Sequence, residues 1–174
     1  GITVYHARFE DVLAAGLVGV PDLTHADPPY GVNERTDRAS KGRSNATASR
    51  DFSAVVGDDR AFDPEPLLAL QRPLVLWGAN HYAPRVPESP SWILWDKRES
   101  TTPDDNADGE LAWSNLGGPL RIFRHLWRGM IKASERTSVR VHPTQKPIAL
   151  SAYVFQRAKL KPGALVLVPY LGSG

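Results

Sequence analysis

Residues 164–168, Ala-Leu-Val-Leu-Val, form an uninterrupted apolar run directly after the helix-breaking pair Pro162-Gly163. A short, continuous apolar run is typical of a strand that is buried on both faces, as in parallel sheets covered by helices on each side. Elsewhere in the chain, strand patterns alternate with helix patterns. This alternation predicts an α/β fold with a mostly parallel sheet.

The other elements are predicted from the same two periodicities. Strands are expected over residues 2–6, 22–26, 73–77, 91–96 and 110–115, and helices through Phe9, Val12 and Leu13, over 64–70 and over 147–159. Residues 120–127 are ambiguous, and a strand followed by irregular chain is the preferred reading. Because ligands of such sheets bind beyond the carboxyl ends of the strands, we expect the candidate site at residues 27–30 and at the turn Gly172-Ser-Gly174.

The length of 174 residues predicts one domain over 1–174. No apolar stretch approaches the roughly 18 residues that span a bilayer, so no membrane partner is expected. The sequence contains no cysteine, which excludes disulfides and thiol nucleophiles within it. No metal site is expected either, because the five histidines lack ligand spacing: His6, His25, His81, His125 and His142. The oligomeric state stays open.

Positive charge is unevenly spread, although the formal net charge is only +2. Two basic runs stand out, one over Arg35, Arg38, Lys41, Arg43 and Arg50, the other over Arg121, Arg124, Arg128, Lys132, Arg136, Arg140 and Lys146. Such runs suit phosphate neutralisation, and double-stranded DNA is the expected partner. Residues 31–63 and 128–141 are expected to be mobile DNA-contacting loops. Solvated, Arg-rich loops are an equally good reading of either run alone.

Asp27-Pro28-Pro29-Tyr30 follows the predicted strand over 22–26. Both prolines lack a backbone N–H, so the Asp27 carboxylate and the Pro28 carbonyl offer acceptors with few donors nearby. The Tyr30 ring adds a flat face for stacking. This combination suits the exocyclic amino group of a nucleobase that has been flipped out of its helix. The alternative is an ordinary turn after a strand.

Three segments occur in this order along the chain: Asp27-Pro-Pro-Tyr30, His142-Pro-Thr-Gln-Lys-Pro147 and Val168-Pro-Tyr-Leu-Gly-Ser-Gly174. Together with 74–80, 92–97, 110–113 and 121–127, this order resembles the DNA amino-methyltransferases of phages and bacteria, in the permuted class where the catalytic motif precedes the glycine motif. The resemblance covers essentially the whole chain.

The resemblance implies a Rossmann-like fold and methyl transfer from S-adenosylmethionine to the exocyclic amino group of a flipped DNA base. The Asp in the first motif favours adenine N6 over cytosine N4. It also implies a cytoplasmic enzyme, bacterial or phage-encoded, of the restriction–modification kind. The residues implied are catalytic Asp27, Pro28, Pro29 and Tyr30; cofactor-binding Thr144, Lys146, Pro169, Tyr170, Gly172, Ser173 and Gly174; and DNA-binding Arg35, Arg38, Lys41, Arg43, Arg124 and Arg128.

The sequence departs from the family at three places. Val168 stands where the glycine motif usually begins with Asp, and Ala7-Arg8 where a Gly-Asp pair is common. The sheet is also expected to be incomplete at the C-terminus, as in a fragment or a degenerate enzyme. Two alternatives therefore stay open: an inactive relic that binds nucleic acid without cofactor turnover, and an unrelated α/β domain.

The remaining aromatic and acidic residues are assigned more ordinary roles. Trp77, Trp92 and Trp95 are expected in the core. Trp127, between two arginines, is the one tryptophan considered for a DNA surface. Asp96 and Glu110 are expected to be structural or ion-paired.

Overall fold

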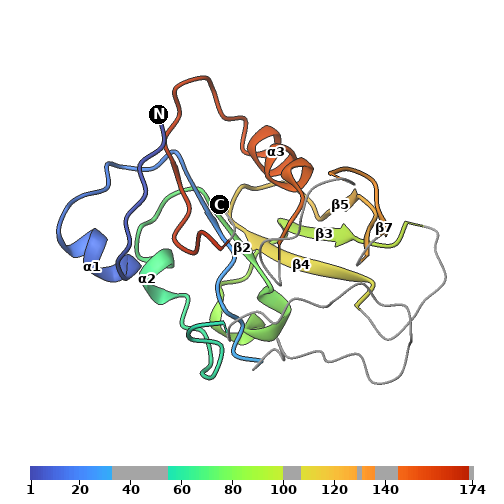
Figure 1. Cartoon of the computed structure of the whole chain (residues 1–174), viewed down its shortest axis with the longest axis horizontal. Helices are drawn as coiled ribbons and strands as arrows, with labels where there is room; N and C mark the ends of the chain where they lie inside the picture. The colour runs from blue at the N-terminus through green and yellow to red at the C-terminus, as the bar shows by residue number, and fades with distance from the viewer. Residues whose placement is uncertain (33–54, 100–106, 129–130, 136–144, 173–174) are drawn as a thin grey trace.

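The computed structural model describes residues 1–32, 55–99, 107–128, 131–135 and 145–172 (Figure 1). Its centre is a six-stranded sheet with the order β5-β3-β4-β2-β1-β8. The strands are β1 (Leu23–Ala26), β2 (Leu74–Trp77), β3 (Trp92–Asp96), β4 (Gly109–Ser114), β5 (Arg121–Arg124) and β8 (Val166–Leu167). A separate two-stranded sheet pairs β6 (Trp127–Arg128) with β7 (Ile131–Lys132).

The strand directions bring distant parts of the chain to one edge. β1 pairs in parallel with β2 and β8, and β3 pairs in parallel with β5. β4 is antiparallel to both β2 and β3, so it alone runs against the rest of the sheet. The start of β4 therefore lies beside the carboxyl ends of its neighbours, and Glu110 stands opposite Trp95. The result is an α/β fold with a mostly parallel mixed sheet, compatible with a Rossmann-like fold.

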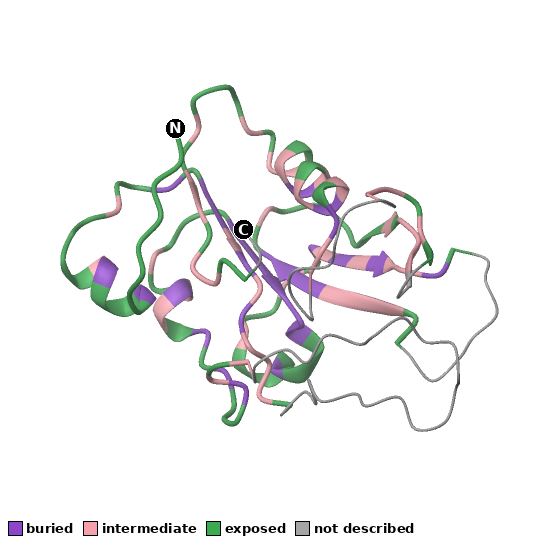
Figure 2. Ribbon diagram, viewed as in Figure 1, coloured by how far each residue is buried: buried purple, intermediate pink, exposed green. Residues whose placement is uncertain are grey.

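Helices cover both faces of the sheet (Figures 1 and 2). The helices are α1 (Phe9–Ala14), α2 (Glu65–Leu68) and α3 (Ile148–Arg157), with the short 3₁₀ turns η1 (Ala79–His81) and η2 (Ala83–Arg85) after β2. Leu74 and Leu76 pack on the face that carries α1 and α2. Val75 and Trp77 pack on the opposite face, against α3. This period-2 alternation gives the protein a core on each side of the sheet.

Most elements predicted from the sequence are confirmed, with their ends moved by a few residues. These are the strands predicted over 22–26, 73–77, 91–96 and 110–115, the helix through Phe9, and the helices predicted over 64–70 and 147–159. The ambiguous segment 120–127 forms β5 and the first residue of β6. Trp77 and Trp95 are buried core residues as expected, and Trp92 is partly buried.

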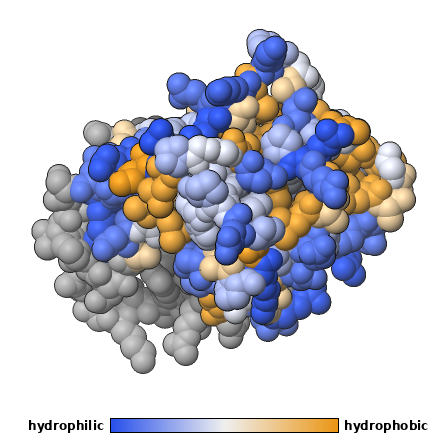
Figure 3. All heavy atoms as spheres, turned by 180° about the vertical axis from the view of Figure 1, so that it is seen from behind, coloured by the Kyte–Doolittle hydropathy of each residue, from blue (hydrophilic) through white to orange (hydrophobic). Residues whose placement is uncertain are grey.

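Two predictions at the edge of the sheet are wrong. Residues 2–6 form no strand, and Ile2 is 94% exposed. The run 164–168 yields only the short strand β8, with Leu165 42% and Val168 39% exposed. The reason is that β8 pairs with β1 and, in the described part of the chain, with no second strand. An edge position leaves apolar side chains at the surface, and Figure 3 shows apolar patches between polar ones on one face of the molecule.

Within the described ranges, the longest helix, α3, spans ten residues, and no helix has the length and apolar character that crossing a membrane requires.

The two-sided core predicts a clear contrast between two leucines. Leu76→Ala removes a side chain with 0% exposure from the centre of β2 and should lower the free energy of unfolding by about 2–5 kcal/mol. Leu120→Ala, at a position that is 49% exposed, should change it by less than about 0.5 kcal/mol. Urea unfolding measures both values, and equal losses would contradict the assigned position of β2.

Candidate active site

The turn Asp27–Tyr30 lies directly after β1, at the carboxyl edge of the sheet. The Asp58 carboxylate accepts hydrogen bonds from the backbone N–H groups of Gly31 at 2.8 Å and Val32 at 3.3 Å. Gly31 has a φ of +77°, and a Cβ there would lie 2.5 Å from the carbonyl oxygen of Arg60. The chain around Asp58 thus packs closely against the end of the turn and fixes its path.

Both oxygens of the Asp27 carboxylate already have donors. The Tyr30 hydroxyl donates to Oδ1 at 2.6 Å, and the Lys146 ammonium donates to Oδ2 at 2.5 Å. Lys146 Nζ also donates to the Tyr30 hydroxyl oxygen at 3.2 Å. The Asp27 side chain keeps 28% of its surface exposed, whereas that of Lys146 keeps 14%. The Asp27 side chain is therefore partly exposed, and the lysine contacts one of its carboxylate oxygens.

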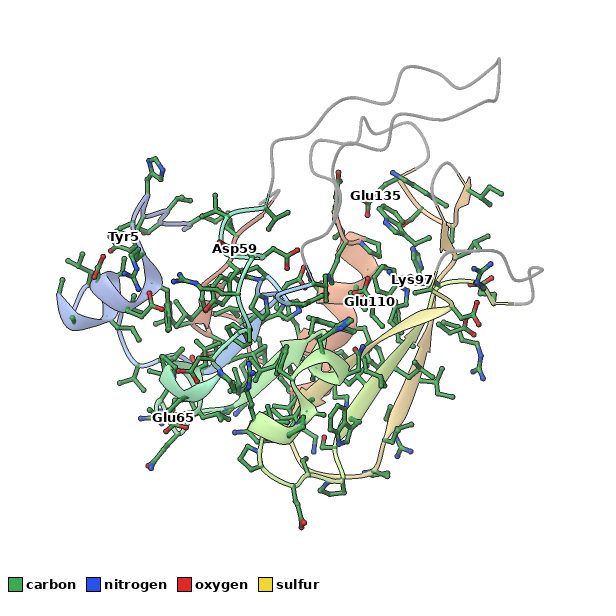
Figure 4. The ribbon with its side chains drawn as sticks, turned by 90° about the horizontal axis from the view of Figure 1, so that it is seen from below. Tyr5, Asp59, Glu65, Lys97, Glu110 and Glu135 are labelled. Carbon is green, nitrogen blue, oxygen red and sulfur yellow. The ribbon has the colours of Figure 1, made fainter. Side chains whose placement is uncertain are left out.

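A second carboxylate holds the same lysine. Glu110, near the start of β4, places Oε2 3.1 Å from Lys146 Nζ. Its Oε1 is paired with the ammonium of Lys97, which follows β3 directly. Figure 4 shows the Lys97 and Glu110 side chains side by side at this edge. We call Asp27, Tyr30, Lys97, Glu110 and Lys146 the charged cluster; its two ammonium groups balance its two carboxylates.

The charges of this cluster are mutually stabilised. Burial by itself would lower the pKa of Lys146, but Asp27 and Glu110 outweigh it and raise the pKa above the ordinary lysine value. Burial would likewise raise the pKa of Glu110, but Lys146 and Lys97 hold it below the ordinary value. Burial and then Asp27 raise the pKa of Tyr30. At neutral pH Lys146 and Glu110 are therefore both ionised, and Tyr30 keeps its hydroxyl proton and can donate it in a hydrogen bond.

The Tyr30 ring is seated between a glycine and a histidine. Gly78 follows β2 with a φ of +69°, and a Cβ on it would lie 2.1 Å from the ring atom Cε1. The ring also stacks on the exposed His81, with 5.2 Å between centroids and 13° between planes. Only glycine at position 78 leaves room for the ring where it lies.

A half-buried histidine in β1 lies close enough to the cluster to feel its charges. His25, in β1, accepts a hydrogen bond from the Trp77 indole N–H at its Nε2, over 2.8 Å. Burial lowers the pKa of His25 to about 4, Asp27 acts against the shift, and Lys146 adds to it. His25 is therefore neutral at pH 7, with its remaining proton on Nδ1.

The segment that follows β8 lies on the neighbouring strand end. Because β8 and β1 are adjacent and parallel, Pro169 and Asp27 leave the sheet at the same edge. The Tyr170 ring packs on Phe9 and Phe62, with centroid distances of 6.5 and 5.9 Å. Burial, then the carboxylates of Glu10 and Asp63, raise the pKa of Tyr170 to about 12. Two acidic side chains thus lie close to this segment.

The residues expected to act with S-adenosylmethionine or the base are only partly brought together. Asp27, Tyr30 and Lys146 meet directly, with Pro28 buried and Pro29 half-buried beside them. Pro169, Tyr170 and Gly172 follow the adjacent strand. Thr144, Ser173 and Gly174 lie outside the described residues, as do Arg35, Arg38, Lys41 and Arg43, and with them most of the two predicted loops.

The remaining candidates for DNA contact lie farther along the sheet. Arg124 ends β5 with a largely exposed side chain, and its Nε lies 3.8 Å from Asp96 Oδ2. Arg128 lies in β6, paired through its backbone with Ile131. Trp127 is half-buried, and its indole N–H donates to the carbonyl oxygen of Gln145 at 3.0 Å.

The sequence did not predict that several of these residues belong to the site. Glu110 was expected to be ion-paired, which is confirmed, but its place beside Asp27 depends on the reversed direction of β4. Gly78 did carry a signal, because it ends the apolar run Leu-Val-Leu-Trp that forms β2. No sequence pattern indicated Lys97, His81 or Asp58, because their roles come from contacts between distant segments.

No known protein-family model matches this chain, and no solved structure matches it either. The described ranges contain no group of three or more His, Cys, Asp or Glu side chains placed to hold a metal ion.

The lowered pKa of His25 predicts a loss of stability in mild acid. Between pH 6.5 and about 4 the unfolded chain binds a proton at His25 that the folded protein excludes, so stability falls as the pH falls through this window. From pH 7 to pH 5 the loss should reach about 2 kcal/mol. Urea unfolding at the two pH values measures it. His25→Gln should flatten this dependence and His6→Gln, at an exposed position, should leave it; a dependence unchanged by His25→Gln would refute the assignment.

The seating of Tyr30 predicts different costs for two glycine substitutions. Gly78→Ala and Gly163→Ala both place a side chain at positive φ, +69° and +88°, but the added Cβ meets the Tyr30 ring only at position 78. Gly163→Ala should cost about 1–2 kcal/mol, the price of the backbone conformation, and Gly78→Ala more than that. Unfolding measurements should also show that Tyr30→Ala relieves the excess. Equal costs at the two positions would contradict the close contact.

Proposed function

We propose that this chain is the catalytic domain of a DNA amino-methyltransferase, which transfers the methyl group of S-adenosylmethionine to the exocyclic amino group of a flipped base, adenine N6 in preference to cytosine N4. The observation that carries the proposal is the Asp27 carboxylate at the carboxyl edge of the sheet. It is partly accessible, and its Oδ2 already accepts a hydrogen bond from an N–H donor, the Lys146 ammonium. A base amino group is a donor of the same kind.

Asp27 addresses the chief chemical difficulty of the reaction. The lone pair of an exocyclic amino nitrogen is delocalised into the ring, which makes the nitrogen a weak nucleophile. By accepting an amino hydrogen, Asp27 and the Pro28 carbonyl favour a pyramidal nitrogen and stabilise the positive charge that develops on it. Asp27 then lies in position to take the proton that the methylated nitrogen loses. No covalent bond to the protein is required.

Tyr30 supports this carboxylate in two ways. Its hydroxyl donates to Oδ1 and so holds the carboxylate in one orientation. Its ring offers a stacking face at the same turn, which should contribute about 1–3 kcal/mol per stacked base. His81, which is exposed, stacks on this ring. We expect the flipped base to take the place of His81 on the ring.

The segment after β8 fits the cofactor by its chemistry. S-adenosylmethionine supplies an electrophilic methyl group on a positively charged sulfur, which keeps the bonding electron pair when the nitrogen takes the methyl group. Val168 removes one expected carboxylate, but Glu10 and Asp63 lie near Tyr170. Carboxylates suit the sulfonium and ammonium groups of the cofactor. The residues that would hold it are Pro169, Tyr170, Gly172, Ser173 and Gly174, with Thr144 toward its methionine end, whereas Lys146 is held by Asp27 and Glu110.

DNA contact is assigned to the basic side chains that the sequence analysis singles out. Arg124 is largely exposed at the end of β5, where a guanidinium can reach a phosphate. The other candidates are Arg35, Arg38, Lys41, Arg43 and Arg128. An enzyme of this kind would act in the cytoplasm of a bacterial host, where its DNA is.

The central prediction concerns Asp27→Ala. Methyl transfer to DNA should fall at least 10²–10³-fold, roughly the effect of removing one charge-stabilising group from an active site, because the lost contact matters most in the transition state. DNA affinity should stay within a few-fold, since phosphate contacts dominate it. Incorporation of labelled methyl groups and DNA titrations measure the two. Asp59→Ala, at an exposed aspartate, is the control. Transfer that persists in Asp27→Ala would refute the mechanism.

Cofactor binding separates the enzyme from an inactive relic. The enzyme should bind S-adenosylmethionine in calorimetry, and Glu10→Gln combined with Asp63→Asn should weaken that binding by removing the two acidic groups near Tyr170. The same double variant should leave DNA affinity unchanged. An absence of binding at millimolar cofactor would instead identify a relic that binds nucleic acid only.

A further inference from the structure

The charged cluster presents a contradiction that the proposed function must resolve. Asp27 is required to accept hydrogens from a base amino group, yet Tyr30 and Lys146 occupy both of its oxygens. The tyrosine contact on Oδ1 leaves the other oxygen free for a substrate. The lysine contact on Oδ2 does not, because an ammonium group at 2.5 Å fills the place where an amino nitrogen would lie.

We infer that Lys146 is the resident occupant of the amine subsite and that an incoming nucleobase amine displaces it from Asp27 onto Glu110. This inference rests on the proposed function and names a positioning residue within it. Lys146 and a base amine present the same chemistry to Oδ2, a nitrogen with hydrogens to donate. The lysine gives the half-buried Asp27 carboxylate a cation partner, without which burying its charge would be costly.

Glu110 makes the exchange feasible. Its Oε2 lies 3.1 Å from Lys146 Nζ, so the ammonium can leave Asp27 and keep an anionic partner without crossing open space. Lys97 holds the opposite oxygen of Glu110 and fixes that carboxylate in place. Because the cluster contains two cations and two anions, displacement of the lysine frees the negative charge of Asp27 for the nitrogen that becomes positive during methyl transfer.

The exchange also bears on specificity. Asp27 Oδ2 offers only acceptor character to whatever replaces the ammonium. An exocyclic amino group can make that bond, whereas a keto oxygen at the same place would meet the carboxylate with a second acceptor. The free energy of breaking the lysine contact is recovered only by a ligand that donates to Oδ2. Lys146 therefore raises the discrimination of the site against bases without an amino group.

Adenosine and purine riboside, which lacks the amino group, provide the test in calorimetry or NMR titration. Glu110→Gln removes the alternative partner of Lys146 and should leave the lysine fixed on Asp27. Adenosine affinity should then fall about tenfold, within the usual range of coupling between sites. Adding Lys146→Met to Glu110→Gln empties the subsite at unchanged net charge and should restore the wild-type affinity within about threefold. Purine riboside should show neither change.

The double variant separates exchange from a merely structural role. If the cluster only stabilised the fold, the second substitution would compound the damage of the first. Near-ultraviolet circular dichroism from the buried Trp77 and Trp95 checks that each variant is folded. Glu88→Gln and Lys161→Met, at exposed positions, are the matched controls. An unchanged adenosine affinity in Glu110→Gln, or no adenosine binding to the double variant, would overturn the inference.

Failure of the exchange and failure of the proposed function give different results. Adenosine titrations need no cofactor and no turnover, so they report on the subsite even in an enzyme that transfers no methyl group. If methyl transfer depends on Asp27 but adenosine affinity does not change in Glu110→Gln, the exchange is refuted and the proposed function stands.

Discussion

The contact between the Lys146 ammonium and the Asp27 carboxylate joins two distant segments of the chain at the carboxyl edge of the sheet. The residues are 119 positions apart, and the bond between them ties the turn after β1 to the segment that leads into α3. Glu110 and Lys97 extend the contact across β4 and β3. Four segments that are remote in the sequence therefore share one network of charges, and the geometry of the proposed site depends on it.

The surrounding fold makes that network possible. Parallel strands bring Asp27 and Lys97 to one edge, and the reversed strand β4 brings the start of a strand, with Glu110, to the same place. Neutral His25 lies nearby and adds no positive charge to compete for Asp27 at pH 7. Gly78 leaves the space that the Tyr30 ring fills. Each feature serves to keep one carboxylate oriented and partly accessible.

Local patterns were enough to predict most of the fold. The continuous apolar run of β2 and the apolar spacing of α1 are properties of neighbouring residues, and both elements were predicted correctly. The prediction that residues 164–168 are buried on both faces was wrong. Their burial depends on how many strands flank β8, and no local pattern contains that information. Likewise Asp27 stood out through its proline neighbours, whereas its bond to Lys146 arises only when the sheet brings both together.

In the proposed exchange, Asp27 Oδ2 is an amine subsite that Lys146 occupies until a substrate arrives. A crystal structure with adenosine bound tests it most directly. In that crystal structure the adenosine amino nitrogen should lie within hydrogen-bonding distance of Oδ2 and its ring should stack on Tyr30. Lys146 Nζ should have moved away from Asp27 and should stay on Glu110. Adenosine bound elsewhere, with Lys146 still on Asp27, would rule out the exchange.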